Sequence, residues 1–143
     1  MPAMIKHVAA LPAAPARAKL LEAGLRPTRQ RVDLAKILFN GEDRHFTAEM
    51  IHTESRTVRH PPSLATVYNT LHLFAEHGLL REIAIYGAKA WYDTKTGPHF
   101  HFYRGDREEL FDIPDAMVPL LNIAAPEGTV IEAIDVVVRL KGV

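Results

Sequence analysis

Apolar residues recur at helical spacing through the first half of the chain, and four segments predict helices. Each segment begins or ends at a residue that favours a helix terminus: 16–23 ends at Gly24, 28–39 begins at Thr28, 47–58 begins at Thr47, and 63–77 begins at Ser63. In the last three segments the apolar stripes are Val32, Ala35, Leu38 and Phe39; Ala48, Ile51 and Val58; and Leu64, Val67, Leu71 and Phe74.

The period then changes to two. Residues 81–86 and 89–93 are rich in residues that favour strands, and Gly87-Ala88 between them predicts a hairpin. Helices followed by a hairpin are the element order of a winged helix-turn-helix, with a long turn at about 58–62 and the hairpin as its wing. We therefore expect an α+β protein whose N-terminal domain is a winged helix-turn-helix of the DNA-binding class.

The composition shifts after "TKTGP", and the rear of the chain predicts a second, smaller α/β domain. Its expected elements are strands at 99–103 and 110–113, a helix at about 115–124 and a long strand at 129–141. These strands are too few to cover both faces of a sheet, so we expect this domain to pair with a copy of itself. The predicted boundaries are a flexible tail at 1–14, the winged-helix domain at 15–94, a hinge at 95–98 and the dimerisation domain at 99–143.

Composition narrows the class of protein. The chain has 143 residues, 48% of them hydrophobic, and no apolar run long enough for a membrane helix, so we expect a cytoplasmic protein without a membrane partner. It has no cysteine, which excludes disulfides, thiolate zinc sites and cysteine nucleophiles. Residues 1–97 carry 13 Lys/Arg and 9 Asp/Glu, whereas 98–143 carry 4 and 8, so the front half is the better partner for a polyanion.

The helix at 63–77 is the expected recognition helix, because such a helix enters the major groove by its first turns. Its candidate contacts with DNA bases are Ser63, Thr66, Tyr68, Asn69 and His72. Around the start of the second helix, the residues expected to reach phosphates or the minor groove are Arg26, Arg29 and Arg31. The competing interpretation is a solvated polar helix face. The predicted hairpin and the arginines favour double-stranded DNA as the partner.

The stretch "GPHFHFY" poses a separate question. On a strand, His99 and His101 point to one side while Phe100 and Phe102 point to the other. Two imidazoles at this spacing can converge on one ion, but a single pair of this kind is a weak metal signal. Taken alone, the stretch favours an ordinary polar strand face over a phenylalanine core, with a metal site as the alternative.

Four segments together give a resemblance to a known family: "AGLRPTRQRVDLAKIL", "HFTAEMI", "SLATVYNTLHLFAEHGLL" and "HFHFY". In order and spacing, over about 15–141, the chain resembles the ferric uptake regulator superfamily, whose members are dimeric, metal-responsive winged-helix transcription regulators. Within it the chain is most similar to the iron response regulators of alphaproteobacteria, which are haem-responsive. The resemblance implies that Tyr68 is the recognition-helix tyrosine and that Arg26 takes the place of the basic residue in the minor groove. Asn69 stands where many members have Arg.

The same resemblance implies a metal site at the hinge. Five positions match the family's ligand pattern in kind: His45, Asp93, His99, His101 and Asp112. We expect Fe or Mn there, with Zn in purified protein. Arg104 and Arg107 replace the family's first Cys-x-x-Cys, so no cysteine-type structural zinc is expected. Phe100 and Ile134 replace ligands of a second rear site, where we expect no metal.

Haem is a further candidate ligand that the resemblance implies. Without cysteine the axial ligand would be histidine, and His99 and His101 are the candidates, with haem or a haem-delivering protein as partner. The function implied is regulation of iron and haem homeostasis by a dimer, or a higher oligomer, on A/T-rich inverted repeats. The alternatives are a regulator of this family that responds to Mn, Zn or peroxide, a metal-dependent hydrolase built on the same His/Asp cluster, and a plain dimerisation protein. Nothing else in the sequence supports an enzyme.

Overall fold

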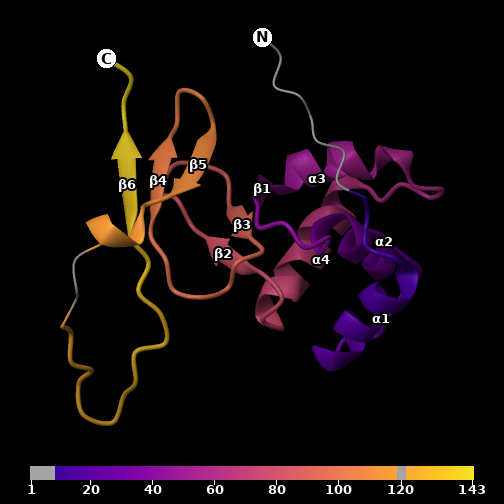
Figure 1. The fold of residues 1–143 in the computed structure, drawn as a ribbon, viewed down its shortest axis with the longest axis horizontal. Helices are drawn as coiled ribbons and strands as arrows, with labels where there is room; N and C mark the ends of the chain where they lie inside the picture. The colour runs from indigo at the N-terminus through magenta and orange to yellow at the C-terminus, as the bar shows by residue number, and fades with distance from the viewer. Residues whose placement is uncertain (1–8, 119–121) are drawn as a thin grey trace. The chain divides into compact units, whose positions relative to one another are not determined.

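A computed structural model describes residues 9–118 and 122–143 of the chain (Figure 1). The chain divides into two compact units. The N-terminal unit comprises the residues up to 84 and 89–96, and the C-terminal unit comprises 85–88 and 97–143. The first unit combines helices with a small sheet and the second contains another small sheet, so the α+β class expected from the sequence is confirmed.

The helical elements of the N-terminal unit are α1 (Ala13–Glu22), α2 (Arg29–Leu38), α3 (Ala48–Glu54), the 3₁₀ turn η1 (Ser55–Thr57) and α4 (Leu64–Glu76). Helices α2, α3 and α4 begin where the sequence predicts caps. The side-chain oxygens of Thr28, Thr47 and Ser63 accept hydrogen bonds from the backbone N–H groups three residues on, at 3.4, 3.3 and 3.1 Å. Each cap satisfies an N–H group that has no partner inside its helix.

Several boundaries differ from the prediction. Helix α1 begins at Ala13, inside the expected tail, and the Leu11 N–H donates to the Lys36 carbonyl at 2.9 Å. Residues 1–8 of that tail lie outside the described part. Helix α3 ends at Glu54 and not near 58, because the chain tightens there into η1. Leu64, expected in the core, is 36% exposed in the first turn of α4.

A three-stranded antiparallel sheet completes the N-terminal unit. Strands β2 (Arg81–Ile83) and β3 (Trp91–Asp93) pair as predicted, over fewer residues than expected. Strand β1 (His45–Thr47) was not predicted, and its pairing with β3 gives the order β1-β3-β2. The strand that leads into α3 is thereby fixed to the second strand of the hairpin.

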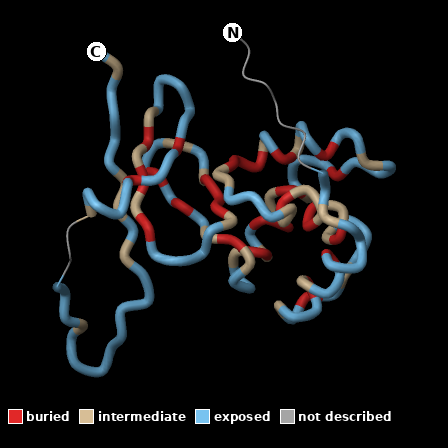
Figure 2. Tube along the Cα trace, viewed as in Figure 1, coloured by how far each residue is buried: buried red, intermediate tan, exposed pale blue. Residues whose placement is uncertain are grey.

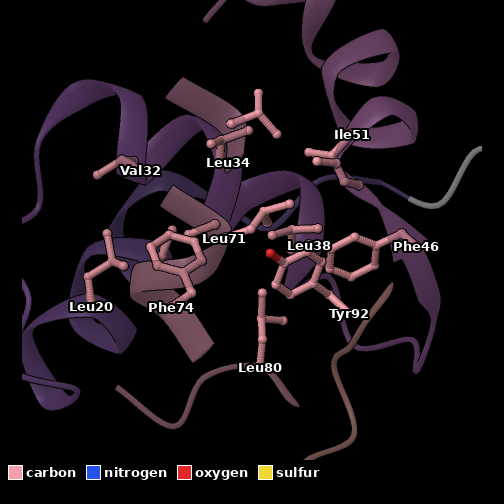
Figure 3. Close-up of a cluster of buried hydrophobic side chains, with 14 of the residues drawn as sticks. Leu20, Val32, Leu34, Leu38, Phe46, Ile51, Leu71, Phe74, Leu80 and Tyr92 are labelled. Carbon is pink, nitrogen blue, oxygen red and sulfur yellow. The ribbon is translucent and has the colours of Figure 1, made fainter. Parts of the chain in front are cut away.

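The core of this unit lies between the helices and strands β1 and β3. Its side chains come from α1, α2, α3 and α4 and from strands β1 and β3 (Figure 3). Phe74 packs against Phe39 with ring centroids 6.0 Å apart, and Phe46 stacks on Tyr92 at the same separation. Side chains of this size dominate core energetics, so they hold α4 and β3 in place beneath the candidate sites.

The C-terminal unit contains β4 (His101–Arg104), β5 (Glu109–Asp112), the 3₁₀ turn η2 (Asp115–Met117) and β6 (Val137–Leu140). Strand β4 is central: it pairs antiparallel with β5 and parallel with β6. None of the helices in the described residues has the length and apolar character that a membrane span requires.

Two predictions about this unit are wrong for its described residues. The helix expected at about 115–124 is a 3₁₀ turn at Asp115–Met117, residues 122–124 form no helix, and 119–121 lie outside the described part. The strand expected at 129–141 is formed only at Val137–Leu140, because β4 offers β6 just four residues of edge. The residues before β6 are largely exposed (Figure 2), and Val130 is 89% exposed.

Candidate metal centre and nucleic-acid interface

Strand register brings His45 and Asp93 together in the N-terminal unit. The two residues are direct partners across the β1–β3 ladder, and His45 Nε2 lies 2.9 Å from Asp93 Oδ2. The second carboxylate oxygen, Oδ1, accepts a hydrogen bond from the Lys95 N–H at 2.8 Å. Asp93 is buried, so its carboxylate is held in one orientation by the strand on one side and the chain after it on the other.

A cross-strand pair of histidine and aspartate also occurs in the C-terminal unit. His101 and Asp112 are partners across the β4–β5 ladder, and His101 Nε2 lies 3.4 Å from Asp112 Oδ1. His99 Nε2 lies 3.4 Å from that same oxygen, and the two imidazole rings have centroids 4.4 Å apart. Three candidate ligands therefore converge on one point within this unit.

The proton on His99 is fixed by its neighbour. His99 Nδ1 lies 2.7 Å from the Gly97 carbonyl, which can only accept, so Nδ1 carries the proton. A neutral imidazole in this tautomer points the lone pair of Nε2 at Asp112 Oδ1, which is also an acceptor. Two acceptors that face each other need a cation between them or a proton on one of them. A metal-ligating histidine is commonly held this way, its second nitrogen donating to a carbonyl.

The donor set fits a divalent transition metal. Imidazole nitrogens and carboxylate oxygens suit Fe, Mn and Zn, and the cysteine ligands that softer ions prefer are lacking in this chain. Each unit alone supplies an incomplete set: His45 with Asp93, and His99 with His101 and Asp112. All five are the residues that the resemblance singles out, and strand register accounts for two of their contacts.

Arginine occupies the place of the family's first zinc cysteine. Arg104 forms a two-point bond with Asp106, from Nε to Oδ1 at 3.0 Å and from Nη2 to Oδ2 at 3.2 Å. The hydrogen bond from Arg104 lowers the pKa of the Asp106 carboxyl. The Arg104–Asp106 ion pair therefore closes the turn between β4 and β5. A thiolate zinc site cannot form there, because the chain has no cysteine.

The candidate DNA contacts on α4 are placed as follows. Asn69 is exposed, and Thr66 is half-buried next to Ser63, whose hydroxyl lies 3.0 Å from that of Thr66. Ser63 also caps the helix, so it has a structural role whatever it touches on DNA. His72 lies 3.1 Å from Glu76 and 3.6 Å from Glu82, so its imidazole faces two carboxylates.

The arginines lie around the start of α2. Arg26 and Arg29 are exposed, and Arg31 Nη1 donates to the Arg26 carbonyl at 3.0 Å. Two basic residues that line the same surface as Arg29 were not among the predicted contacts. Arg59 and His60 line a surface cavity of about 350 Å³ together with Arg29 and Asp33. The basic stretch "RTVRH" before Pro61 was the feature of the sequence that could have indicated them.

Tyr68 contacts α3. Its hydroxyl donates to Glu49 Oε1 at 2.8 Å, and this bond, with burial, raises the pKa of the Tyr68 hydroxyl. Burial alone would raise the pKa of Glu49, but the bond from Tyr68, a backbone hydrogen bond and the Lys89 charge outweigh it and lower that pKa. The carboxylate is therefore ionised when it accepts from Tyr68. Sequence reasoning did not foresee this contact.

The chain matches a known protein family. The model of the ferric uptake regulator family matches residues 22–137, which is most of the chain. The chain belongs to the ferric uptake regulator family. Proteins of this family are transcription regulators.

Individual relatives within the ferric uptake regulator family are moderately similar. The chain is 37% identical over 82 residues to the peroxide operon regulator of Bacillus subtilis, covering 57% of this chain and 56% of that protein. It is 31% identical over 101 residues to the ferric uptake regulation protein of Pseudomonas aeruginosa, covering 70% of this chain and 75% of that protein. The matched part thus spans little more than half of the Bacillus protein.

Solved structures of this family share the fold. The ferric uptake regulator of Pseudomonas aeruginosa with manganese has a TM-score of 0.63 and 25% identity, covering 89% of this chain and 98% of that one. The ferric uptake regulator of Vibrio cholerae has a TM-score of 0.67 and 22% identity, covering 88% and 98% of the two chains. The chain therefore shares the fold of these ferric uptake regulators.

Proposed function

We propose that this protein is a metal-responsive transcription regulator of iron and haem homeostasis that binds A/T-rich inverted repeats of double-stranded DNA as a homodimer. The observation that carries the proposal is the pair of cross-strand His–Asp contacts, one in each unit of a ferric uptake regulator chain. Because a transcription regulator acts where the DNA lies, this protein would be located in the cytoplasm.

The sensor in this proposal is a single ion, Fe or Mn, held jointly by the two clusters. His45 and Asp93 would supply the share of the N-terminal unit, and His99, His101 and Asp112 that of the C-terminal unit. The bound ion would neutralise the two carboxylates and complete the lone-pair contacts of the imidazoles. Because it needs ligands from both units, it would favour the arrangement of the units in which all five meet, and a ligand shifts an equilibrium only by such differential affinity.

The DNA-reading part of the proposal rests on the N-terminal unit. Helix α4 would enter the major groove with Tyr68 and Asn69, whose amide suits adenine. Ser63, Thr66 and His72 remain candidate contacts on the same helix, although the two carboxylates beside His72 oppose a contact with phosphate. Arg26, Arg29 and Arg31 would position the duplex through phosphates or the minor groove.

The dimer is supported by apolar surface that the described chain leaves open in the C-terminal unit. Ile123, Val130 and Ile131 are each more than 40% exposed. A cavity of about 360 Å³ beside β4 and β6 is lined mostly by Phe100, Phe102, Ile113, Met117, Val118, Val136 and Val138. Exposed apolar surface of this kind marks interaction sites, and a second copy of the chain would cover it.

Assignment to iron and haem, as opposed to Mn, Zn or peroxide, rests on the segment "PSLATVYNTLHLFAEHGLLREI" and on the lack of cysteine. The similarity to the Bacillus peroxide operon regulator favours peroxide sensing as the second candidate. If haem is the ligand, His99 or His101 would bind its iron, and Asp112 would have to give up its place beside them.

The test is a titration of metal-free protein with Mn(II), Fe(II) and haem, each read out as binding to A/T-rich inverted-repeat duplexes. A change in DNA affinity with one of these ligands supports the proposal. Loss of that response in His45→Ala plus His99→Ala, with the dimer retained, would assign it to the five-residue site. Wild-type metal content and DNA binding in this variant would refute the sensor. Unchanged specific binding in Tyr68→Ala plus Arg26→Ala would refute the reading surface.

A further inference from the structure

Tyr68 and Glu49 join the two helices of the reading motif. The Tyr68 hydroxyl on α4 donates to Glu49 Oε1 on α3 at 2.8 Å, and Lys89 Nζ, just before β3, lies 3.7 Å from the same oxygen. The other carboxylate oxygen, Oε2, is buried and has no hydrogen-bond partner in the described part of the chain. A buried acceptor without a partner costs stability, and the contacts of Oε1 with Tyr68 and Lys89 offset that cost.

The carboxylate is held on a rigid support. Glu49 lies in the first turn of α3, two residues after the Thr47 cap, where the helix dipole favours a negative charge. Tyr68 lies in the second turn of α4, between the buried Val67 and Thr70. A bond between these two positions fixes the direction in which the Tyr68 ring leaves α4.

The Tyr68 hydroxyl is therefore already engaged in a hydrogen bond within the protein. An O–H donor bonded to an ionised carboxylate belongs to the stronger class of hydrogen bonds. Breaking it to reach a DNA phosphate would weaken binding by roughly ten- to hundredfold relative to a free hydroxyl. The ring carbons carry no such cost. They can contact the C5-methyl group of thymine, which marks that base in the major groove.

We infer that Glu49 is a positioning residue for DNA recognition: it holds the hydroxyl of Tyr68 so that the ring, and not the hydroxyl, reads a thymine methyl group. Lys89 offsets the charge of the carboxylate, which would otherwise repel the duplex at this point. This inference rests on the proposed DNA-binding function. It names the base contact that function would use and the residue that sets its geometry.

The experiment uses full-length protein loaded with whichever of Mn(II), Fe(II) or haem supports DNA binding. A/T-rich inverted-repeat duplexes bound by wild type are selected from a random pool, and each thymine of the tightest duplex is replaced in turn by deoxyuridine. Removing one buried methyl group should weaken wild-type binding about fourfold at one position in each half-site. The variants are Glu49→Ala, Glu49→Gln, Tyr68→Phe and the double variant Glu49→Ala/Tyr68→Phe. Glu22→Ala, an exposed acid on α1, is the control for loss of one negative charge.

We expect the thymine preference to fall below about twofold in Glu49→Ala and in Tyr68→Phe, with the double variant no worse than either, because one interaction is removed in all three. Glu49→Gln should keep the preference, since its amide oxygen accepts the same bond. It also serves as the variant that preserves the fold, and melting curves compare all of them with Glu22→Ala.

Three results would overturn the inference. One is a full thymine preference in Glu49→Ala. Another is tighter specific binding by Glu49→Ala than by Glu22→Ala, which would show that Glu49 keeps the Tyr68 hydroxyl from contacting DNA. The third is a loss in Tyr68→Phe that Glu49→Ala does not share, which would show that the hydroxyl itself contacts DNA. A wild-type protein that selects no duplex overturns the proposed function and this inference together, whereas wild-type selection with insensitive variants overturns only the inference.

Discussion

Asp112→Asn should reduce the stability that metal adds without destabilising the metal-free protein. In the metal-free protein Asp112 Oδ1 faces the lone pair of His99 Nε2 at 3.4 Å, an arrangement of two acceptors. An asparagine amide can turn its N–H₂ group toward that nitrogen and make a hydrogen bond there. A bond of this kind contributes about 0.5–1.5 kcal/mol to the free energy of unfolding. We therefore expect the metal-free variant to be as stable as wild type or more so.

Metal should stabilise the variant less than it stabilises wild type. An ion present at 100 times its Kd adds about 2.7 kcal/mol to the free energy of unfolding. Loss of groups that only orient metal ligands already costs 10–100-fold in affinity, so loss of a charged ligand should cost at least about tenfold. The same ion concentration then adds only about 1.4 kcal/mol. The difference of about 1.3 kcal/mol corresponds to roughly 4 °C in Tm for a chain of this size.

The assay is thermal unfolding followed by circular dichroism at about pH 8, an alkaline condition in which histidines are generally neutral. Melting curves are recorded with a chelator and with Mn(II). Asp115→Asn, an exposed acid in η2, is the matched control and should respond to Mn(II) as wild type does. If Asp112→Asn lowers Tm equally with and without Mn(II), Asp112 pairs with charged imidazoles and the argument from the His99 tautomer is refuted.

Three more predictions concern helix α4, strand β3 and the C-terminal unit. Ser63→Ala should lower the free energy of unfolding by about 1 kcal/mol, seen as a lower urea midpoint, because the α4 cap is lost; an unchanged midpoint would mean that Ser63 does not cap in solution. Burial, with the nearby Glu82 charge, raises the pKa of Tyr92 to about 12, so stability present below about pH 10 should fall as the pH rises toward 12, by up to roughly 3 kcal/mol. Tyr92→Phe should abolish that decline in pH-dependent urea unfolding, and a decline identical to wild type would contradict the assignment. Val138→Asp should shift the protein from dimer to monomer in sedimentation equilibrium, and a dimer of wild-type affinity would place the interface elsewhere.

Local patterns predicted most of the N-terminal unit. The caps at Thr28, Thr47 and Ser63 are confirmed because capping depends on a side chain and an N–H group three residues away, which both lie in one short stretch. The hairpin is confirmed for the same reason. Leu64 was misassigned because helical spacing gives the side of a helix but not how far the core extends along it.

Features that depend on distant partners were not predictable. Strand β1 has three residues and no alternation that periodicity could detect, and it exists because β3 offers an edge to it. The segment expected to form a strand at 129–141 is rich in β-branched residues, but its ladder with β4 covers only Val137–Leu140. The Tyr68–Glu49 bond joins residues 19 apart on different helices, which no spacing rule describes.

The candidate metal ligands were named from the resemblance, whereas their geometry came from the structure. Nothing in the sequence says that His45 and Asp93 are register partners, or that His101 and Asp112 are. The tautomer of His99 likewise depends on the fold of residues 97–99, which brings the Gly97 carbonyl to Nδ1. The chemical type of the site was therefore predictable, but the orientation of its donors was not.

The pairing of β1 with β3 also has a consequence for folding kinetics. His45 and Asp93 are 48 residues apart in sequence, and α3, α4 and β2 all lie between them. Contacts of such long sequence separation form late, after local helices and hairpins, because loop closure must come first. A ribosome-bound chain that has exposed only the residues up to about 90 would therefore lack this half of the site. If the proposed site binds an ion, His45 and Asp93 can hold it together only after β3 has been synthesised and has paired with β1.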